Sequence, residues 1–142
     1  MEAMRRIAHL AGTAAALLLA GAAPVGPAPA SDAGAMVRPV AAEPLPNVPG
    51  NRITAVVVTY GPGGKSPKHH HAGSVLAYVL TGAIRSQNAP PGPVKVYRAG
   101  ESFFEPPGSE HLISENASDT RAASLLAVFV APEGAVLTRF DK

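Results

Sequence analysis

Short apolar segments separated by turns fill the chain from Arg52 to its end. Residues 53–60 are β-branched and apolar, and a turn-forming Gly-Pro-Gly-Gly sequence follows them directly. Residues 75–80 are apolar at nearly every position, which predicts a strand that is buried on both faces. Residues 94–98 alternate between apolar and polar side chains, as expected for a strand with one face in solvent.

The same pattern continues to the end of the chain, and no apolar repeat of helical period occurs after the first 30 residues. Turn signals recur about every 8–12 residues, a spacing typical of an all-β sandwich or barrel. We therefore predict an all-β domain of about eight short strands. The predicted strands span residues 53–60, 75–80, 83–87, 94–98, 102–105, 111–115, 122–130 and 136–140.

The N-terminal 30 residues have the pattern of an export signal. Arg5 and Arg6 precede an apolar run over residues 7–23, and residues 28–30 (Ala-Pro-Ala) have the small-x-small form of a signal-peptidase site. An uncleaved membrane anchor is the alternative, since a run of about 17 residues approaches the lower limit for a membrane span. Because the run is rich in Ala and a Pro-rich segment follows it, we interpret residues 1–30 as a cleaved signal peptide. This predicts a periplasmic or secreted protein, with no stable membrane insertion after cleavage.

Residues 31–50 contain four prolines and show no apolar periodicity. This composition predicts an extended, Pro-rich linker or arm. Such an arm could add a strand to a neighbouring subunit, a possibility that the sequence leaves open. The predicted organisation is therefore a signal peptide (1–30), an arm (31–50) and a folded domain (51–142).

The overall composition fits this organisation and rules out two covalent features. The 142 residues suit one domain, and 46% of them are hydrophobic. The chain has no cysteine, which excludes a disulfide framework and a lipid-attached export signal. Without residues 1–30 the charge is 10 basic minus 9 acidic residues, or +1. This near-neutral balance gives no support to nucleic-acid binding.

Three consecutive histidines, His69, His70 and His71, follow a Gly- and Pro-containing turn. If they enter a strand, the period of two directs His69 and His71 to one face and His70 to the other. Two imidazoles on one face are close enough to hold a metal ion, and neutral imidazole is the commonest protein metal ligand. A solvated histidine cluster on a loop is the alternative at this point.

A second informative segment contains His111, which follows the turn Pro106-Pro107-Gly108. Alone, His111 would be an ordinary strand histidine. Beyond residue 30, however, the chain has only four histidines, and all four fall in these two segments.

Together the two segments resemble the two signatures of the cupins. The first signature matches Gly63, His69, His71 and Gly82. The second matches Gly100, Pro106, Gly108, His111 and, one position later than usual, Asn116. The resemblance covers about residues 52–132 and implies a double-stranded β-helix (jelly roll) barrel that binds one divalent metal ion in its mouth. The metal ligands that it implies are His69, His71 and His111.

One position departs from the cupin pattern. The cupin signature has a glutamate ligand between the histidine pair and Gly82, and the matching residue here is Val75. Three neutral imidazoles leave a divalent metal its full charge, which would favour an anionic substrate. Glu105 or Gln87 could supply a fourth ligand from a neighbouring strand, but we expect both to be ordinary solvated strand residues.

The resemblance also bears on cofactor and function. Three-histidine cupins include mononuclear iron dioxygenases that act on thiols or β-diketones. We therefore favour Fe(II), with Mn, Zn or Ni as the other candidates, since imidazole suits several of these metals. The function expected is that of an exported, metal-dependent, dioxygenase-like oxidoreductase acting on a small molecule. The alternatives are a non-catalytic module that binds a small molecule or metal, and a structural barrel that has lost its metal.

Other residues have structural expectations. We expect the aromatic side chains of Tyr78, Phe103, Phe104 and Phe129 to pack in the barrel wall. Glutamates 101, 110 and 115, which flank His111, are expected in solvent. Since cupin barrels commonly pair, the resemblance also implies a homodimer.

Overall fold

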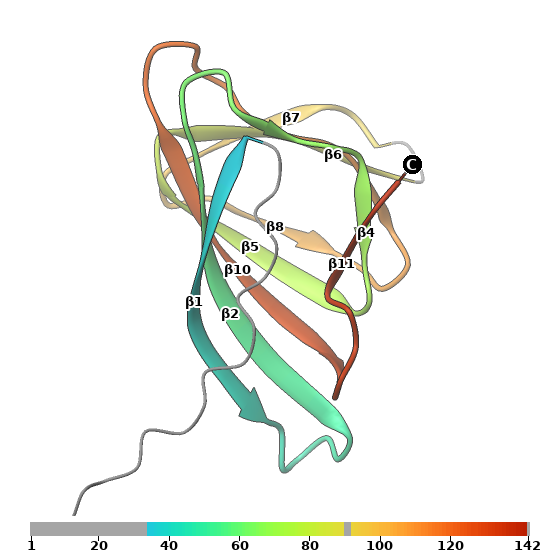
Figure 1. Cartoon of the computed structure of the whole chain (residues 1–142). Helices are drawn as coiled ribbons and strands as arrows, with labels where there is room; N and C mark the ends of the chain where they lie inside the picture. The colour runs from blue at the N-terminus through green and yellow to red at the C-terminus, as the bar shows by residue number, and fades with distance from the viewer. Residues whose placement is uncertain (1–33, 90–91, 142) are drawn as a thin grey trace, which may run out of the picture.

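The computed structural model describes residues 34–89 and 92–141, which form β-strands and turns without a helix (Figure 1). The eleven strands are β1 (Ala35–Pro44), β2 (Asn51–Tyr60), β3 (Lys65–Ser66), β4 (His69–His71), β5 (Ser74–Thr81), β6 (Ala83–Ala89), β7 (Lys95–Arg98), β8 (Ser102–Glu105), β9 (Glu110–Asn116), β10 (Ala123–Pro132) and β11 (Thr138–Phe140). Each of the eight predicted strands overlaps one of these elements. The predicted all-β jelly-roll fold is confirmed.

The strands form two antiparallel sheets that face each other. The first sheet has the order β1-β2-β10-β5-β8, and the second has the order β11-β4-β9-β6-β7, with β3 added beside β9. Strands that are far apart in sequence are therefore neighbours in space, as β2 and β10 are over ten registered residue pairs. In the second sheet, the direct antiparallel pairing of β4 with β9 brings the two histidine segments together.

Strand β1 lies inside the segment predicted as a Pro-rich arm. It pairs with β2 of the same chain from Ala35 to Pro44, with a shift of register between Pro39 and Ala41. Proline cannot donate a ladder hydrogen bond and is tolerated on edge strands and at bulges, which explains how a Pro-containing segment forms β1. The domain boundary at residue 51 stays a prediction, and the predicted signal peptide (1–30) lies outside the described residues.

The core lies between the sheets and is built from alternate residues of the long strands. Val56 and Tyr60 of β2, Val79 of β5 and Leu125 of β10 are all buried. The prediction that residues 75–80 are buried on both faces is wrong. Leu76, Tyr78 and Leu80 are 46%, 44% and 40% exposed, so only the face of β5 that carries Val75, Ala77 and Val79 is covered.

The aromatic residues follow the same division. Phe103 and Phe129 are buried between the sheets, as expected for wall residues, whereas Phe104 is 57% exposed on the outer face of β8. Tyr78 and Phe104 therefore do not pack in the interior, because each occupies the outward position of its strand. In the part of the chain that the structure describes, no helix is long and apolar enough to cross a membrane.

Asn116, the last residue of the second signature, has a structural role. Its side-chain amide donates hydrogen bonds to the carbonyl oxygens of Gly61 (2.8 Å) and Arg121 (2.7 Å), and its Oδ1 accepts one from the Ser118 amide (2.9 Å). It thus ties together two loops at one end of the barrel and does not line the interior cavity.

Candidate metal centre

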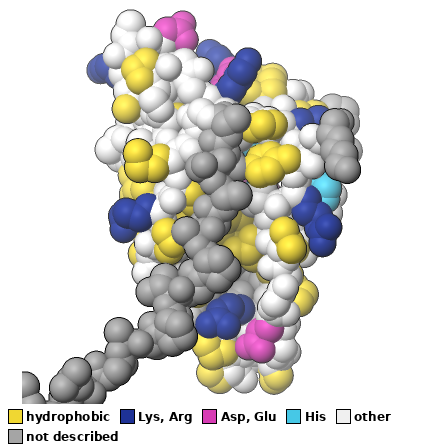
Figure 2. Space-filling model, in the orientation of Figure 1, with side chains coloured by type: hydrophobic (Ala, Val, Ile, Leu, Met, Phe, Trp, Pro, Cys, Tyr) yellow, Lys and Arg dark blue, Asp and Glu magenta, His cyan; other side chains and the backbone are white. Residues whose placement is uncertain are grey.

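Three histidines converge inside the barrel. His69 and His71 lie on β4, and His111 lies on β9 directly opposite His69 in the register of the two strands. Their candidate ligand nitrogens all lie within 4.8 Å of one another. The three side chains are 4%, 9% and 3% exposed, respectively. In agreement, little histidine surface is visible on the face shown in Figure 2.

The alternation of β4 produces this convergence. His69 and His71 point inward, while the side chain of His70 is 44% exposed and its Nδ1 lies 3.6 Å from Asp141. The prediction that the period of two would separate His70 from its neighbours is confirmed, and a solvated histidine cluster is excluded.

Backbone carbonyl groups orient the two imidazoles of β4. The Nδ1 of His69 lies 2.7 Å from the Pro67 carbonyl oxygen, and the Nδ1 of His71 lies 3.0 Å from that of Leu137. Because a carbonyl oxygen can only accept, each Nδ1 carries the proton and donates it. In the neutral tautomer the lone pair is then on Nε2, where it is available to a metal ion.

Burial also keeps His71 neutral. It lowers the pKa of His71 to about 4, although the nearby carboxylate of Glu105 opposes this effect. At neutral pH this imidazole therefore carries no proton on the nitrogen that faces the cavity, which is the state that a metal ligand requires.

The third imidazole is held by a different partner. His111 Nε2 lies 2.9 Å from the hydroxyl of Ser86 on β6, and His111 Nδ1 faces the cavity. The hydroxyl can donate or accept, so it can bond a protonated Nε2 and leave Nδ1 as the ligand atom. The sequence analysis did not identify Ser86, whose inward direction depends on the pairing of β6 with β9.

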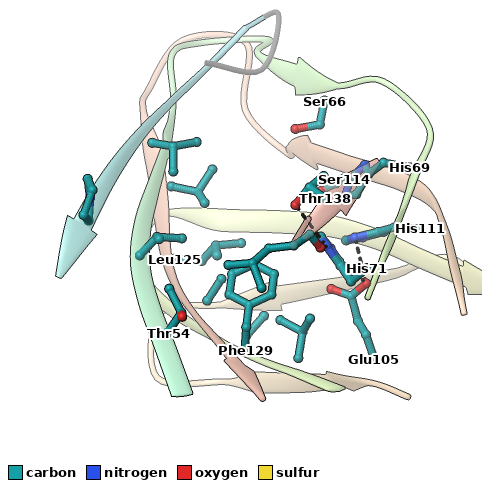
Figure 3. Close-up of a pocket in the computed structure, with 18 of the residues that line it drawn as sticks. Thr54, Ser66, His69, His71, Glu105, His111, Ser114, Leu125, Phe129 and Thr138 are labelled. Carbon is teal, nitrogen blue, oxygen red and sulfur yellow. Dashed lines mark hydrogen bonds and ion pairs between the residues drawn. The ribbon is translucent and has the colours of Figure 1, made fainter. Parts of the chain in front are cut away.

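A carboxylate lies beside these imidazoles, contrary to expectation. Glu105 is only 2% exposed, and its Oε2 lies 3.2 Å from His111 Nδ1 and 3.7 Å from His71 Nε2 (Figure 3). Burial raises the pKa of Glu105, but the adjacent imidazole of His111 and the other two histidines outweigh burial, so the pKa lies below its ordinary value. The prediction that Glu105 is a solvated strand residue is therefore wrong.

The other polar candidates are not at the centre. The Nε2 of Gln87 donates to the carbonyl oxygen of Gly92 (2.9 Å), and Gln87 does not line the cavity that contains the histidines. Glu110 and Glu115 pair with Lys68 and Arg85, both at 2.6 Å, and Glu101 bonds the Arg98 amide. None of these three glutamates lines the cavity, but only Glu101 is exposed as expected, since Glu110 and Glu115 are half-buried in their ion pairs.

The histidines open into a cavity of about 910 Å³ between the two sheets. Its walls are mainly apolar and come from β1, β2, β5 and β10, with Val56, Leu125 and Phe129 among the lining residues. Thr54 and Leu125 lie across the cavity from the imidazoles in Figure 3. The polar groups that could bind a metal are therefore gathered on one side, and space for a small molecule lies next to them.

The comparisons with known proteins agree with this architecture. Residues 56–129, just over half of the chain, match the family model described as a cupin domain. No curated protein sequence matches the chain.

Among solved structures, a cupin-like protein from Thermotoga maritima is similar with a TM-score of 0.59 and 17% identity, covering 75% of each chain. An oxalate oxidase in complex with the substrate analogue glycolate is similar with a TM-score of 0.56 and 21% identity, and the match covers 80% of this chain and 58% of the oxidase. The DMSP lyase DddQ from Ruegeria pomeroyi is similar with a TM-score of 0.53 and 19% identity. The match covers 62% of this chain but only 42% of the length of that enzyme. At these identities the likeness shows the fold alone.

Proposed function

Because the chain belongs to the cupin family, we propose that it uses His69, His71 and His111 to hold one divalent metal ion and acts on a small molecule in the adjoining cavity. The observation that carries this proposal is the convergence of three buried imidazoles on one side of a largely apolar cavity of about 910 Å³.

The donor set fits a divalent transition metal. Two of the three imidazoles have Nδ1 fixed by a carbonyl oxygen, and burial keeps His71 neutral. Imidazole nitrogen suits Fe(II), Zn and Ni. We propose Fe(II) as the first candidate, ahead of Mn, Zn and Ni, and dioxygenase-like oxidation as the reaction class. When bound, such a metal would supply Lewis acidity and electron transfer between substrate and O₂.

The residues of the chain define what the substrate must be. The walls from β2 and β10 offer apolar contacts, so a ligand should be partly apolar along most of its length. Its polar end should lie at the imidazoles, where Glu105 can accept a proton or a hydrogen bond. A dioxygenase inserts both atoms of O₂ into the substrate, which supplies the electrons, so that no separate reductant is required. The proposed substrates are therefore small thiols, diketones or phenols.

Elemental analysis and oxygen uptake test this function. Untagged protein should contain close to one metal ion per chain, and it should consume O₂ with at least one member of a panel of thiols, diketones and phenols. His111→Ala should lose both properties, and His70→Ala, whose imidazole lies on the outer side of β4, should keep both. Bound metal without any turnover would support a non-catalytic binding module. Folded wild-type protein that takes up no metal would refute the proposal.

We also propose that the protein is exported to the periplasm or secreted. The basic start, the apolar run and the Ala-Pro-Ala sequence within residues 1–30 support this proposal. N-terminal sequencing of protein from fractionated cells tests it. A mature N-terminus near residue 31 in the exported fraction is expected, and intact Met1 in the cytoplasmic fraction would contradict it.

A homodimer is the proposed assembly, and the outer face of the first sheet supports it. Leu76 and Phe104 are cross-strand neighbours on this face and are 46% and 57% exposed, and Tyr78 lies beside them. Exposed apolar side chains grouped in this way are typical of interaction surfaces. Leu76→Lys should shift the mass in light scattering from dimer to monomer. Val48→Lys, a change at an exposed apolar residue outside the strands, should leave the mass unchanged.

A further inference from the structure

We infer that Glu105 is the fourth protein ligand of the metal, taking the place of the glutamate that the cupin signature has at the position of Val75. This inference rests on the proposed metal site and extends it, because it assigns a ligand from a different strand. The signature glutamate would come from β5, whereas Glu105 is the last residue of β8.

The pairing of the two strands makes the replacement possible. Val75 and Glu105 are direct partners in the antiparallel register of β5 and β8. Cross-strand partners on one face have Cβ atoms about 4.5–5.5 Å apart. Both side chains point inward, since Val75 is 1% and Glu105 2% exposed and both line the same cavity. A glutamate at either position can therefore bring its carboxylate to the same region.

The distance from Glu105 to His111 fits ligands that share one metal ion, and the distance from Glu105 to His71 is about 0.3 Å longer than expected for such ligands. Ligand atoms about 2.1 Å from a metal are about 3.0–3.4 Å apart when the geometry lies between octahedral and tetrahedral. The Oε2 of Glu105 is 3.2 Å from His111 Nδ1 and 3.7 Å from His71 Nε2. Figure 3 shows the carboxylate directed toward these two imidazoles.

The lack of a hydrogen bond to one carboxylate oxygen of Glu105 is a second observation that supports the assignment. Glu105 Oε2 is fully buried and meets no hydrogen-bond criterion among the described residues, although His111 Nδ1 lies 3.2 Å away. A buried carboxylate oxygen without a partner is costly. Coordination to a cation would satisfy it, because carboxylate oxygen is a ligand for all the candidate metals.

The charge of the centre follows from this assignment. With three neutral imidazoles alone, a divalent ion would keep a charge of +2, whereas the Glu105 carboxylate reduces it to +1. The centre would then have the same charge as the ordinary cupin set of three histidines and one glutamate. The difference is that the glutamate comes from the second signature segment instead of the first.

Four proteins test the inference: wild type, Glu105→Gln, Val75→Glu/Glu105→Gln, and Glu110→Gln as the matched control. Glu110 is also a glutamate next to a strand histidine, but it pairs with Lys68 at the surface.

Zn(II) affinity is measured by chelator competition, and the visible spectrum of the Co(II) form reports the ligand set. Glu105→Gln should weaken Zn(II) binding by at least the roughly 10- to 100-fold that loss of an outer-shell partner costs, and should change the Co(II) spectrum. Val75→Glu should restore both in the double variant.

The outcomes separate this inference from the proposed function. If wild type binds no metal, the proposed metal site itself fails. If wild type binds metal while Glu105→Gln has the same affinity and Co(II) spectrum, the metal site stands and the assignment of Glu105 is overturned. If Glu105→Gln does not fold, infrared difference spectra of the wild type decide, because Zn(II) must shift a carboxylate stretching band when a glutamate is a ligand. The absence of such a shift would overturn the inference.

Discussion

The burial of His71 predicts that the metal-free protein loses stability when the pH falls from neutral to weakly acidic. The pKa of this imidazole is about 4 in the folded protein, against 6.5 as its ordinary value. Between these two values the unfolded chain binds a proton at His71 and the folded chain does not. Stability therefore rises with pH across this window and falls as the pH is lowered.

The size of the effect follows from the two pKa values. Linkage over the pH range from about 7 to about 5 gives a loss of about 2 kcal/mol from this one residue, and the full difference would be about 3 kcal/mol below the folded pKa. His71 is only 9% exposed, so solvent screening reduces the value little. The carboxylate of Glu105 also favours the folded state through its lowered pKa, but this contribution is lost only below the unfolded value of 4.5. The window above about pH 5 therefore reports on His71 and not on Glu105.

Urea unfolding of chelator-treated protein at several pH values measures this loss. Between about pH 7 and pH 5, the unfolding free energy of His71→Gln should fall by about 2 kcal/mol less than that of the wild type. His70→Gln changes the exposed neighbour on the same strand and should retain the contribution of His71. If wild type and His71→Gln lose stability in parallel over this range, burial does not hold His71 neutral and the reasoning is refuted.

Three further predictions concern single residues. His111→Ala should reduce bound metal from about one ion per chain to near zero in elemental analysis, and metal content equal to wild type would contradict the three-histidine centre. Gly73→Ala should prevent folding, as judged by circular dichroism, because the new Cβ would lie 2.0 Å from a backbone oxygen of β10; Gly61→Ala, with nothing within 4 Å, is the control that should fold. Tyr60→Phe removes a buried hydroxyl that contacts two serine hydroxyls at 2.8 and 2.9 Å. It should lower the unfolding free energy by about 1–3 kcal/mol in urea, and a loss below about 0.5 kcal/mol would contradict this role.

Much of the fold could be predicted because the strands are separated by Gly and Pro turns. Three strands lie outside the eight predicted ones, and two of them, β3 and β4, are only two and three residues long. The third is β1, in which Pro39 and Pro44 interrupt the apolar alternation that is typical of a strand. Its stability comes from pairing with β2, a contact between segments that no local pattern encodes. The exposure of Leu76 and Tyr78 was not predicted for a related reason. An apolar run does not reveal whether its second face packs against another sheet or lies on the surface of the molecule.

The candidate site could be predicted only where chain spacing determines geometry. The separation of His69 and His71 by one residue places them on one face of any strand, and this was confirmed. Glu105 follows the same rule with Phe103 on β8, so its face could be inferred. What alternation does not give is the register between β8 and β5, which sets the Glu105 carboxylate opposite Val75. That register depends on the whole sheet.

Charge balance connects the buried glutamate with the proposed function. Among the described residues, the ion-pair partners of Glu105 are His71 and His111, and neither Lys nor Arg reaches it. An ionised carboxylate in the interior is costly unless a positive charge is close. His71 does not supply that charge at neutral pH, because burial lowers its pKa to about 4. A bound divalent cation would balance the carboxylate while the imidazoles stay neutral. Metal should therefore stabilise the folded protein by about 2.7 kcal/mol when its free concentration is about 100 times the dissociation constant.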